Sequence, residues 1–81
     1  MTDDIEKPLD EWLLGPKNQC LAVLWANGYV LLYSWARGRI GRCIAAYRWV
    51  GGSLRNAISG MDTTTEGRLA RDVHERWKKL T

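Results

Sequence analysis

The stretch Cys20–Trp35, CLAVLWANGYVLLYSW, decides the fold class of this chain of 81 residues. Two apolar segments, residues 20–26 and residues 29–35, stand on either side of Asn27-Gly28. Asn-Gly is the preferred pair for a two-residue β-hairpin turn of type I′, in which both residues have positive φ. A helix that ends at Asn27-Gly28 is the competing interpretation, since Leu and Ala also favour helix. We predict a β-hairpin over residues 20–35.

Alternation along these two strands puts apolar side chains on both faces of the hairpin. The residues that share a face are Leu21, Val23 and Trp25 on the first strand, and Tyr29, Leu31, Tyr33 and Trp35 on the second. Because the opposite positions are also fairly apolar, we expect one of two arrangements. Either both sides of the hairpin are covered, or one side contacts a second copy and the protein is a homodimer through the hairpin face.

Residues 40–50 fit two periodicities. As a helix they form an apolar stripe with a period of 3.6 residues, and as a strand they separate arginines from aromatic residues. The aromatic ending and the terminator Gly51-Gly52 favour a possible third antiparallel strand over residues 40–50. After it, residues 53–59 are predicted to form a short helix with Ser53 as its cap.

The C-terminal segment has the clearest pattern in the chain. An apolar stripe at helical spacing runs along it: Leu69, Val73, Trp77 and Leu80. Thr63 and Glu66 have the spacing of a capping box, which marks the start of a helix. Basic residues occupy the final turn, where they interact favourably with the helix dipole. We predict a helix over residues 64–80.

These elements predict an α+β fold in which a small antiparallel sheet of two or three strands packs against the C-terminal helix. The alternative is an all-α arrangement of three to four short helices. In that alternative residues 45–58 fit a helix-turn-helix motif, although with a spacing about two residues too short. Residues 1–11 form an acidic head that we expect to be flexible, and residues 12–81 form a single small domain.

Charge is unevenly distributed along the chain, whose formal net charge is +3. Residues 1–16 contain five acidic residues and one lysine, whereas residues 37–55 contain five arginines and no acidic residue. Aromatic residues lie among these arginines. The candidate partner-binding residues are Arg37, Arg39, Arg42, Arg48, Arg55, Tyr47 and Trp49.

Arginines interspersed with aromatic residues are typical of two kinds of interface. Arginine binds phosphate by charge and stacks on bases, and aromatic rings are platforms for unpaired bases. Arginine and tryptophan also dominate the centres of protein interfaces, where guanidinium groups pair with carboxylates. The predicted partner is therefore a nucleic acid or an acidic protein surface. An ordinary solvated face, with arginine stems lying over an aromatic core, is the alternative without a binding role.

No pattern in the sequence indicates catalysis, a metal or a cofactor. His74 has no further ligands at metal-binding spacing, and neither Cys20 nor Cys43 has a recognisable catalytic base. Two cysteines are too few for a disulfide framework, although a single Cys20–Cys43 bridge stays open as an alternative. No secretory signal follows Met1, and no segment is suited to crossing a membrane. We expect no enzyme activity, no cofactor, no membrane partner and a cytoplasmic location.

The sequence thus predicts a small non-enzymatic binding protein that has an accessory or regulatory function in association with nucleic acid. The alternative is a protein-binding inhibitor or adaptor that blocks a larger complex, for example a host defence complex. Small, tryptophan-rich chains of uneven charge are frequent among proteins of phages and mobile elements, which is an analogy of size and composition.

Overall fold

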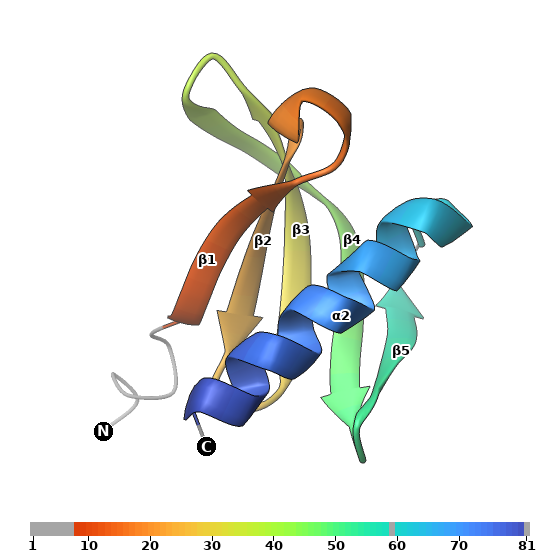
Figure 1. Ribbon diagram of the computed structural model, residues 1–81. Helices are drawn as coiled ribbons and strands as arrows, with labels where there is room; N and C mark the ends of the chain where they lie inside the picture. Colours follow the sequence, from red (N-terminus) through yellow and green to blue (C-terminus); the bar gives the residue numbers. More distant parts are fainter. Residues whose placement is uncertain (1–7, 59, 81) are drawn as a thin grey trace.

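A computed structural model describes residues 8–58 and 60–80, which form one antiparallel sheet and a C-terminal helix (Figure 1). The five strands lie in the order β1-β2-β3-β4-β5, so each strand pairs with its neighbours along the chain. The elements are β1 (Pro8–Leu14), the 3-10 turn η1 (Pro16–Asn18), β2 (Cys20–Trp25), β3 (Tyr29–Ala36), β4 (Arg39–Val50), β5 (Ser53–Ile58) and helix α2 (Thr63–Leu80). The predicted α+β fold is confirmed, and the all-α alternative is wrong.

The predicted hairpin over residues 20–35 is formed by β2 and β3. Its turn differs from the predicted type I′ form, which needs positive φ at both central residues. Gly28 has a φ of 91°, whereas Asn27 does not have positive φ. Instead, the side-chain oxygen of Asn27 accepts a hydrogen bond from the Tyr29 N–H at 3.1 Å. The connection is therefore a three-residue loop, residues 26–28, that ends in a left-handed glycine.

The third strand predicted over residues 40–50 is present as β4, which pairs with β3. Two register shifts interrupt this pairing, one on each side of the pair formed by Tyr33 and Cys43. Because an extra residue turns the following side chains over, Ala45 lies opposite Leu32 on the other face of the sheet from Cys43. Simple alternation would have put Cys43 and Ala45 on the same face.

Residues 53–58 form a strand, so the helix predicted over residues 53–59 is wrong. Gly51 and Gly52 both have positive φ, 56° and 82°, and form a two-residue turn between β4 and β5. A turn of this kind returns the chain directly alongside the strand it has left. Pairing with β4 therefore outweighs the weak helical preference of this short segment. The same hairpin excludes a helix-turn-helix.

The sheet has a further strand at its N-terminal edge, where none was predicted. β1 begins at Pro8, which pairs with Trp25, and runs antiparallel to β2. Of the acidic head predicted over residues 1–11, residues 1–7 lie outside the described residues, and the rest belongs to β1. With β1 and β5 included, the sheet has five strands instead of the predicted two or three.

The helix predicted over residues 64–80 is confirmed as α2, but its cap differs from the prediction. The cap is Asp62 and not Thr63. The Asp62 carboxylate accepts hydrogen bonds from the Thr65 N–H at 3.0 Å and from the Thr65 hydroxyl at 2.8 Å. These bonds lower the pKa of Asp62, and the hydroxyl is the larger cause. Since Asp62 caps the helix, Glu66 can contact the sheet instead.

Helix α2 crosses one face of the sheet diagonally, from β5 to β1 (Figure 1). Leu69 and Val73 of its inner stripe are fully buried, and Trp77 packs against the same core. The predicted stripe also included Leu80, whose side chain lies outside the described residues. We call the sheet surface under the helix the covered face, and its buried residues are Leu14, Cys20, Ala22, Leu24, Val30, Leu32, Ala45 and Tyr47.

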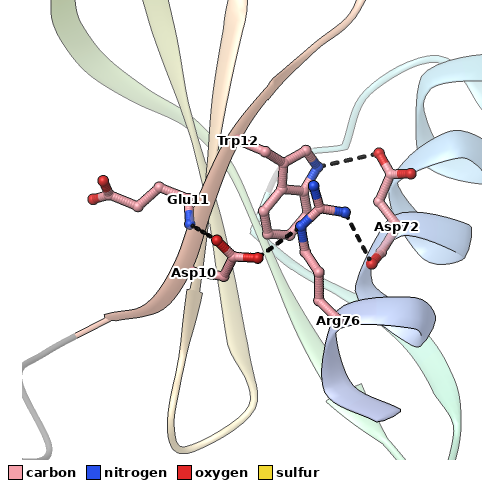
Figure 2. Close-up of polar contacts among 5 residues, drawn as sticks. All are labelled: Asp10, Glu11, Trp12, Asp72 and Arg76. Carbon is pink, nitrogen blue, oxygen red and sulfur yellow. Dashed lines mark hydrogen bonds and ion pairs between the residues drawn. The ribbon is translucent and has the colours of Figure 1, made fainter. Parts of the chain in front are cut away.

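A cluster of polar contacts joins α2 to the edge strand β1 (Figure 2). Asp10 of β1 forms an ion pair with Nε of Arg76 at 2.9 Å. The Arg76 guanidinium lies 4.0 Å from the centroid of the Trp12 ring. The indole N–H of Trp12 donates a hydrogen bond to the Asp72 carboxylate at 3.1 Å. The carboxylates of Asp10 and Asp72 are thus engaged between the sheet and the helix.

Tyr47 joins the middle of the sheet to the start of α2. Only 2% of this residue is exposed. Its hydroxyl donates a hydrogen bond to Glu66 at 2.6 Å and accepts one from the Met61 N–H at 2.8 Å. Burial, reinforced by the hydrogen bond to Glu66, raises the pKa of Tyr47 to about 12. The folded state therefore favours the neutral phenol.

We expect Tyr47→Phe to lower the free energy of unfolding by about 1–3 kcal/mol near neutral pH, because Met61 and Glu66 lose their shared partner. The folded-state pKa lies above the ordinary value of 10.0. This stabilisation is therefore complete below pH 10 and is lost as the pH rises toward 12. Urea titrations of both proteins should show a stability difference that shrinks above pH 10. A constant difference up to pH 11 would contradict this role of the hydroxyl.

Candidate functional site

The structure separates the predicted binding residues into three places. Arg48 and Arg55 lie on the face of the sheet opposite α2, which we call the open face. Tyr47 and Trp49 flank Arg48 along β4 and therefore lie on the covered face. The remaining three arginines lie in the distal part of the β3–β4 hairpin: Arg37, Arg39 and Arg42.

Tyr47 and Trp49 have partners within the fold. Tyr47 is a core residue, so its ring is not accessible to a binding partner. Trp49 packs against the core and contacts the His74 ring of α2, with 6.0 Å between the ring centroids. A groove of about 630 Å³ lies between the β4–β5 hairpin and α2, and both Trp49 and Arg71 line it. Neither aromatic residue shares a surface with Arg48.

The open face carries a broad apolar and aromatic surface. Its residues on β1, β2 and β3 are Leu13, Leu21, Val23, Trp25, Tyr29, Leu31, Tyr33 and Trp35. Leu21 and Val23 are 9% and 3% exposed, although they do not belong to the core under α2. Within residues 8–58 and 60–80, no second helix covers this face.

Arg48 and Arg55 are direct neighbours on the open face. They occupy paired positions of β4 and β5, and both side chains are exposed. Like charges directly opposite each other on a sheet are destabilising. No described carboxylate forms an ion pair with either arginine. The positive charge of this pair is therefore uncompensated within the part of the chain that the structure describes.

One row of side chains crosses the open face from β2 to β5, and we call it the aromatic–arginine row: Trp25, Tyr29, Arg48 and Arg55. The guanidinium carbon of Arg48 lies 5.4 Å from the centroid of the Tyr29 ring, which is a cation–π contact. The indole N–H of Trp25 is buried and has no hydrogen-bond partner among the described residues. A buried donor without a partner is unfavourable. The row thus combines two aromatic rings, an unsatisfied donor and two cations.

The turn of the β3–β4 hairpin places an arginine in a strained conformation. Arg37 and Gly38 form this turn, with φ values of 54° and 73°. The left-handed region costs a residue with a Cβ atom about 1–2 kcal/mol. The β4–β5 turn uses two glycines for the same geometry and avoids this cost. The arginine at position 37 therefore costs the β3–β4 turn stability that the β4–β5 turn keeps.

The cysteines and the histidine are dispersed in the fold. Cys20 is buried on the covered face, where burial raises its pKa, and Cys43 is exposed beside Tyr33 on the open face. Both thiols are free, and the alternative of a Cys20–Cys43 bridge is not realised. No group of described His, Cys, Asp and Glu side chains could hold a metal ion. In residues 8–58 and 60–80, no helix has the length and apolar character required to span a bilayer.

No family model, no curated protein and no solved structure matches this chain. Sequence reasoning did not include Trp25 and Tyr29 among the candidate binding residues. The sequence of the hairpin did indicate them. The hairpin is apolar on both faces, and a single helix covers only one side of a sheet, so the helix leaves the residues of the other face uncovered.

We expect Arg37→Asn to raise the free energy of unfolding by about 0.5–1 kcal/mol, because Asn tolerates positive φ and Asn-Gly suits a type I′ turn. Urea unfolding of the variant and the parent protein measures this difference. Arg39→Asn is the matched control, since Arg39 belongs to the same hairpin and has no positive φ. The control should not be stabilised. Equal or lower stability of Arg37→Asn would show that the turn is unstrained.

Proposed function

We propose that this protein is a small non-enzymatic binding protein with nucleic-acid-associated accessory or regulatory work as its function. Its interface is the open face together with the β3–β4 hairpin. The observation that carries the proposal is the pair Arg48–Arg55, two cations in paired positions with no carboxylate partner among the described residues. Phosphate groups of a nucleic acid supply the missing negative charge. Release of the counterions bound to those phosphates contributes to the affinity.

Arginine suits this role because its planar guanidinium donates two parallel hydrogen bonds to a phosphate. Neighbouring strands hold Arg48 and Arg55 about 5 Å apart at the backbone. The pair therefore presents two such groups to one segment of a phosphate backbone. An anion between them also screens their repulsion, so binding relieves an unfavourable contact of the free protein.

The arginines of the β3–β4 hairpin extend the positive surface. Arg37, Arg39 and Arg42 are exposed, and none of them forms an ion pair in the described part of the chain. The tip of the hairpin extends past the part of the sheet that α2 crosses (Figure 1). The net charge of +3 adds a long-range attraction for an anionic partner. A reducing cytoplasm, in which both cysteines remain thiols, is the location that we propose.

A protein partner is the second candidate, and the apolar character of the open face favours it. Ile58 of β5 is 68% exposed, and Leu13 and Leu31 are half-buried. An inhibitor or adaptor of phage or mobile-element type, which blocks a larger complex, would cover these side chains and pair the arginines with carboxylates. A second copy of the chain, bound through the hairpin face, would cover the same residues.

Replacement of Arg48 and Arg55 together by Gln tests the proposal. Electrophoretic mobility or fluorescence anisotropy with labelled DNA at several salt concentrations gives the affinity. The slope of log K against log salt should become shallower by about 1.4–1.8, because each phosphate contact contributes roughly 0.7 on single strands and 0.9 on duplexes. Stability should stay equal or rise by a few tenths of a kcal/mol, since the like-charge contact is gone.

The matched control is Arg68→Gln with Arg71→Gln, which removes the same charge from exposed positions of α2. This control should keep most of the affinity of the parent protein. Equal losses in the two double variants would mean that only net charge matters. That outcome would remove the open face as the interface. No DNA or RNA binding by the parent protein at low salt would overturn the function itself.

A further inference from the structure

We infer that the open face takes nucleic acid as a single strand, with unpaired bases stacked on the aromatic side chains and phosphates on Arg48 and Arg55. This inference rests on the proposed function and names the form of its ligand. Its basis is the aromatic–arginine row, in which rings and cations occupy neighbouring strands on one surface.

The two halves of the row suit the two halves of a nucleotide. Trp25 and Tyr29 lie on β2 and β3, and the arginines continue the row on β4 and β5. Neighbouring strands are about 4.8 Å apart, so Trp25 and Arg55 are separated by about 14 Å across the sheet. Aromatic rings bind bases of any sequence through their π-faces, and arginines bind the backbone beside them. A strand laid along the row therefore meets both kinds of group.

Further aromatic residues extend this platform toward the β3–β4 hairpin. Tyr33 and Trp35 follow Tyr29 at every second position of β3, so they share its face. All four rings of the open face retain exposed surface. Beyond Trp35 lie the arginines of the hairpin, which provide phosphate contacts at the other end of the platform.

A duplex does not fit this surface. The bases of a duplex are stacked inside it, so the rings of the open face would meet sugar and phosphate instead of bases. The major groove is about 12 Å wide and admits a helix or a two-stranded ribbon. Four spacings between five strands make this sheet about 19 Å wide. The β4–β5 hairpin is narrow enough for the groove and carries both Arg48 and Arg55, but none of the four rings of the open face lies on it.

Arg48 has a different contact in the free protein and in the complex. Its guanidinium lies over the Tyr29 ring in the structure, 5.4 Å from the centroid. An exposed cation–π contact is weaker than a base stacked on an aromatic ring. An incoming base therefore displaces the guanidinium from Tyr29, and Arg48 turns to the neighbouring phosphate. Tyr29 is 37% exposed and is thus the ring that a base reaches first.

The test compares single strands with a duplex on the intact protein. Fluorescence anisotropy measures binding of labelled oligo(dT), oligo(U) and a DNA duplex of the same length, each of about twelve nucleotides, within the site sizes of single-strand binders. We expect at least one single strand to bind tenfold more tightly than the duplex. The two single-strand arms tell DNA from RNA. A duplex that binds as tightly as both single strands overturns the inference and leaves the proposed function standing.

Tyr29→Leu removes the stacking ring but keeps an apolar side chain. The affinity for the preferred single strand should fall roughly five- to hundredfold, which is the range for loss of one base–aromatic stack. Tyr29→Phe retains a ring and should keep the affinity of the parent protein. His74→Leu is the control, because it removes an exposed ring from α2. Near-UV circular dichroism verifies that each variant is folded. Unchanged affinity of folded Tyr29→Leu overturns stacking. Failure of every nucleic acid to bind overturns the proposed function together with this inference.

Discussion

A sheet with two apolar faces and one helix to cover them is the constraint on which the rest of this structure depends. α2 buries Leu69 and Val73 against the covered face, and this burial is the main source of stability. Leu21 and Val23 of the open face are 9% and 3% exposed, although α2 packs on the opposite face. Among the described residues no further element covers the open face. Apolar side chains of the open face therefore remain available to a binding partner after the chain has folded.

Two carboxylates are engaged at the junction between the sheet and α2, whereas two arginines of the open face have no such partner among the described residues. Asp10 engages Arg76 beside Trp12, and Glu66 accepts the hydrogen bond of Tyr47, so these carboxylates serve the junction between sheet and helix (Figure 2). On the open face the paired cations of β4 and β5 have no such partner in the described chain. The carboxylates of Asp10 and Glu66 thus support folding at the covered face, while Arg48 and Arg55 on the open face are available for binding. This division predicts that affinity and stability can be changed separately.

Some of this was predictable from the sequence, and the failures have physical causes. The hairpin around Asn27-Gly28 and the helix stripe are local patterns, which a sequence displays directly. β5 is a strand because β4 pairs with it, and its residues carry no pattern of their own. Tyr47 was grouped with Arg48 as a binding residue because they are adjacent in sequence, yet adjacent strand residues face opposite sides. The aromatic–arginine row depends on strand register, which bulges shift and composition does not reveal.

The tryptophan side chains offer the most direct measurement of where the ligand binds. Trp25 and Trp35 belong to the open face, whereas Trp12 and Trp77 pack between the sheet and α2. Their indole N–H signals can be followed in a ¹⁵N-edited NMR spectrum while a single-stranded oligonucleotide is added. Binding to the open face predicts that the signals of Trp25 and Trp35 move and those of Trp12 and Trp77 stay in place. Shifts confined to Trp12 and Trp77, with Trp25 and Trp35 unmoved, would contradict it.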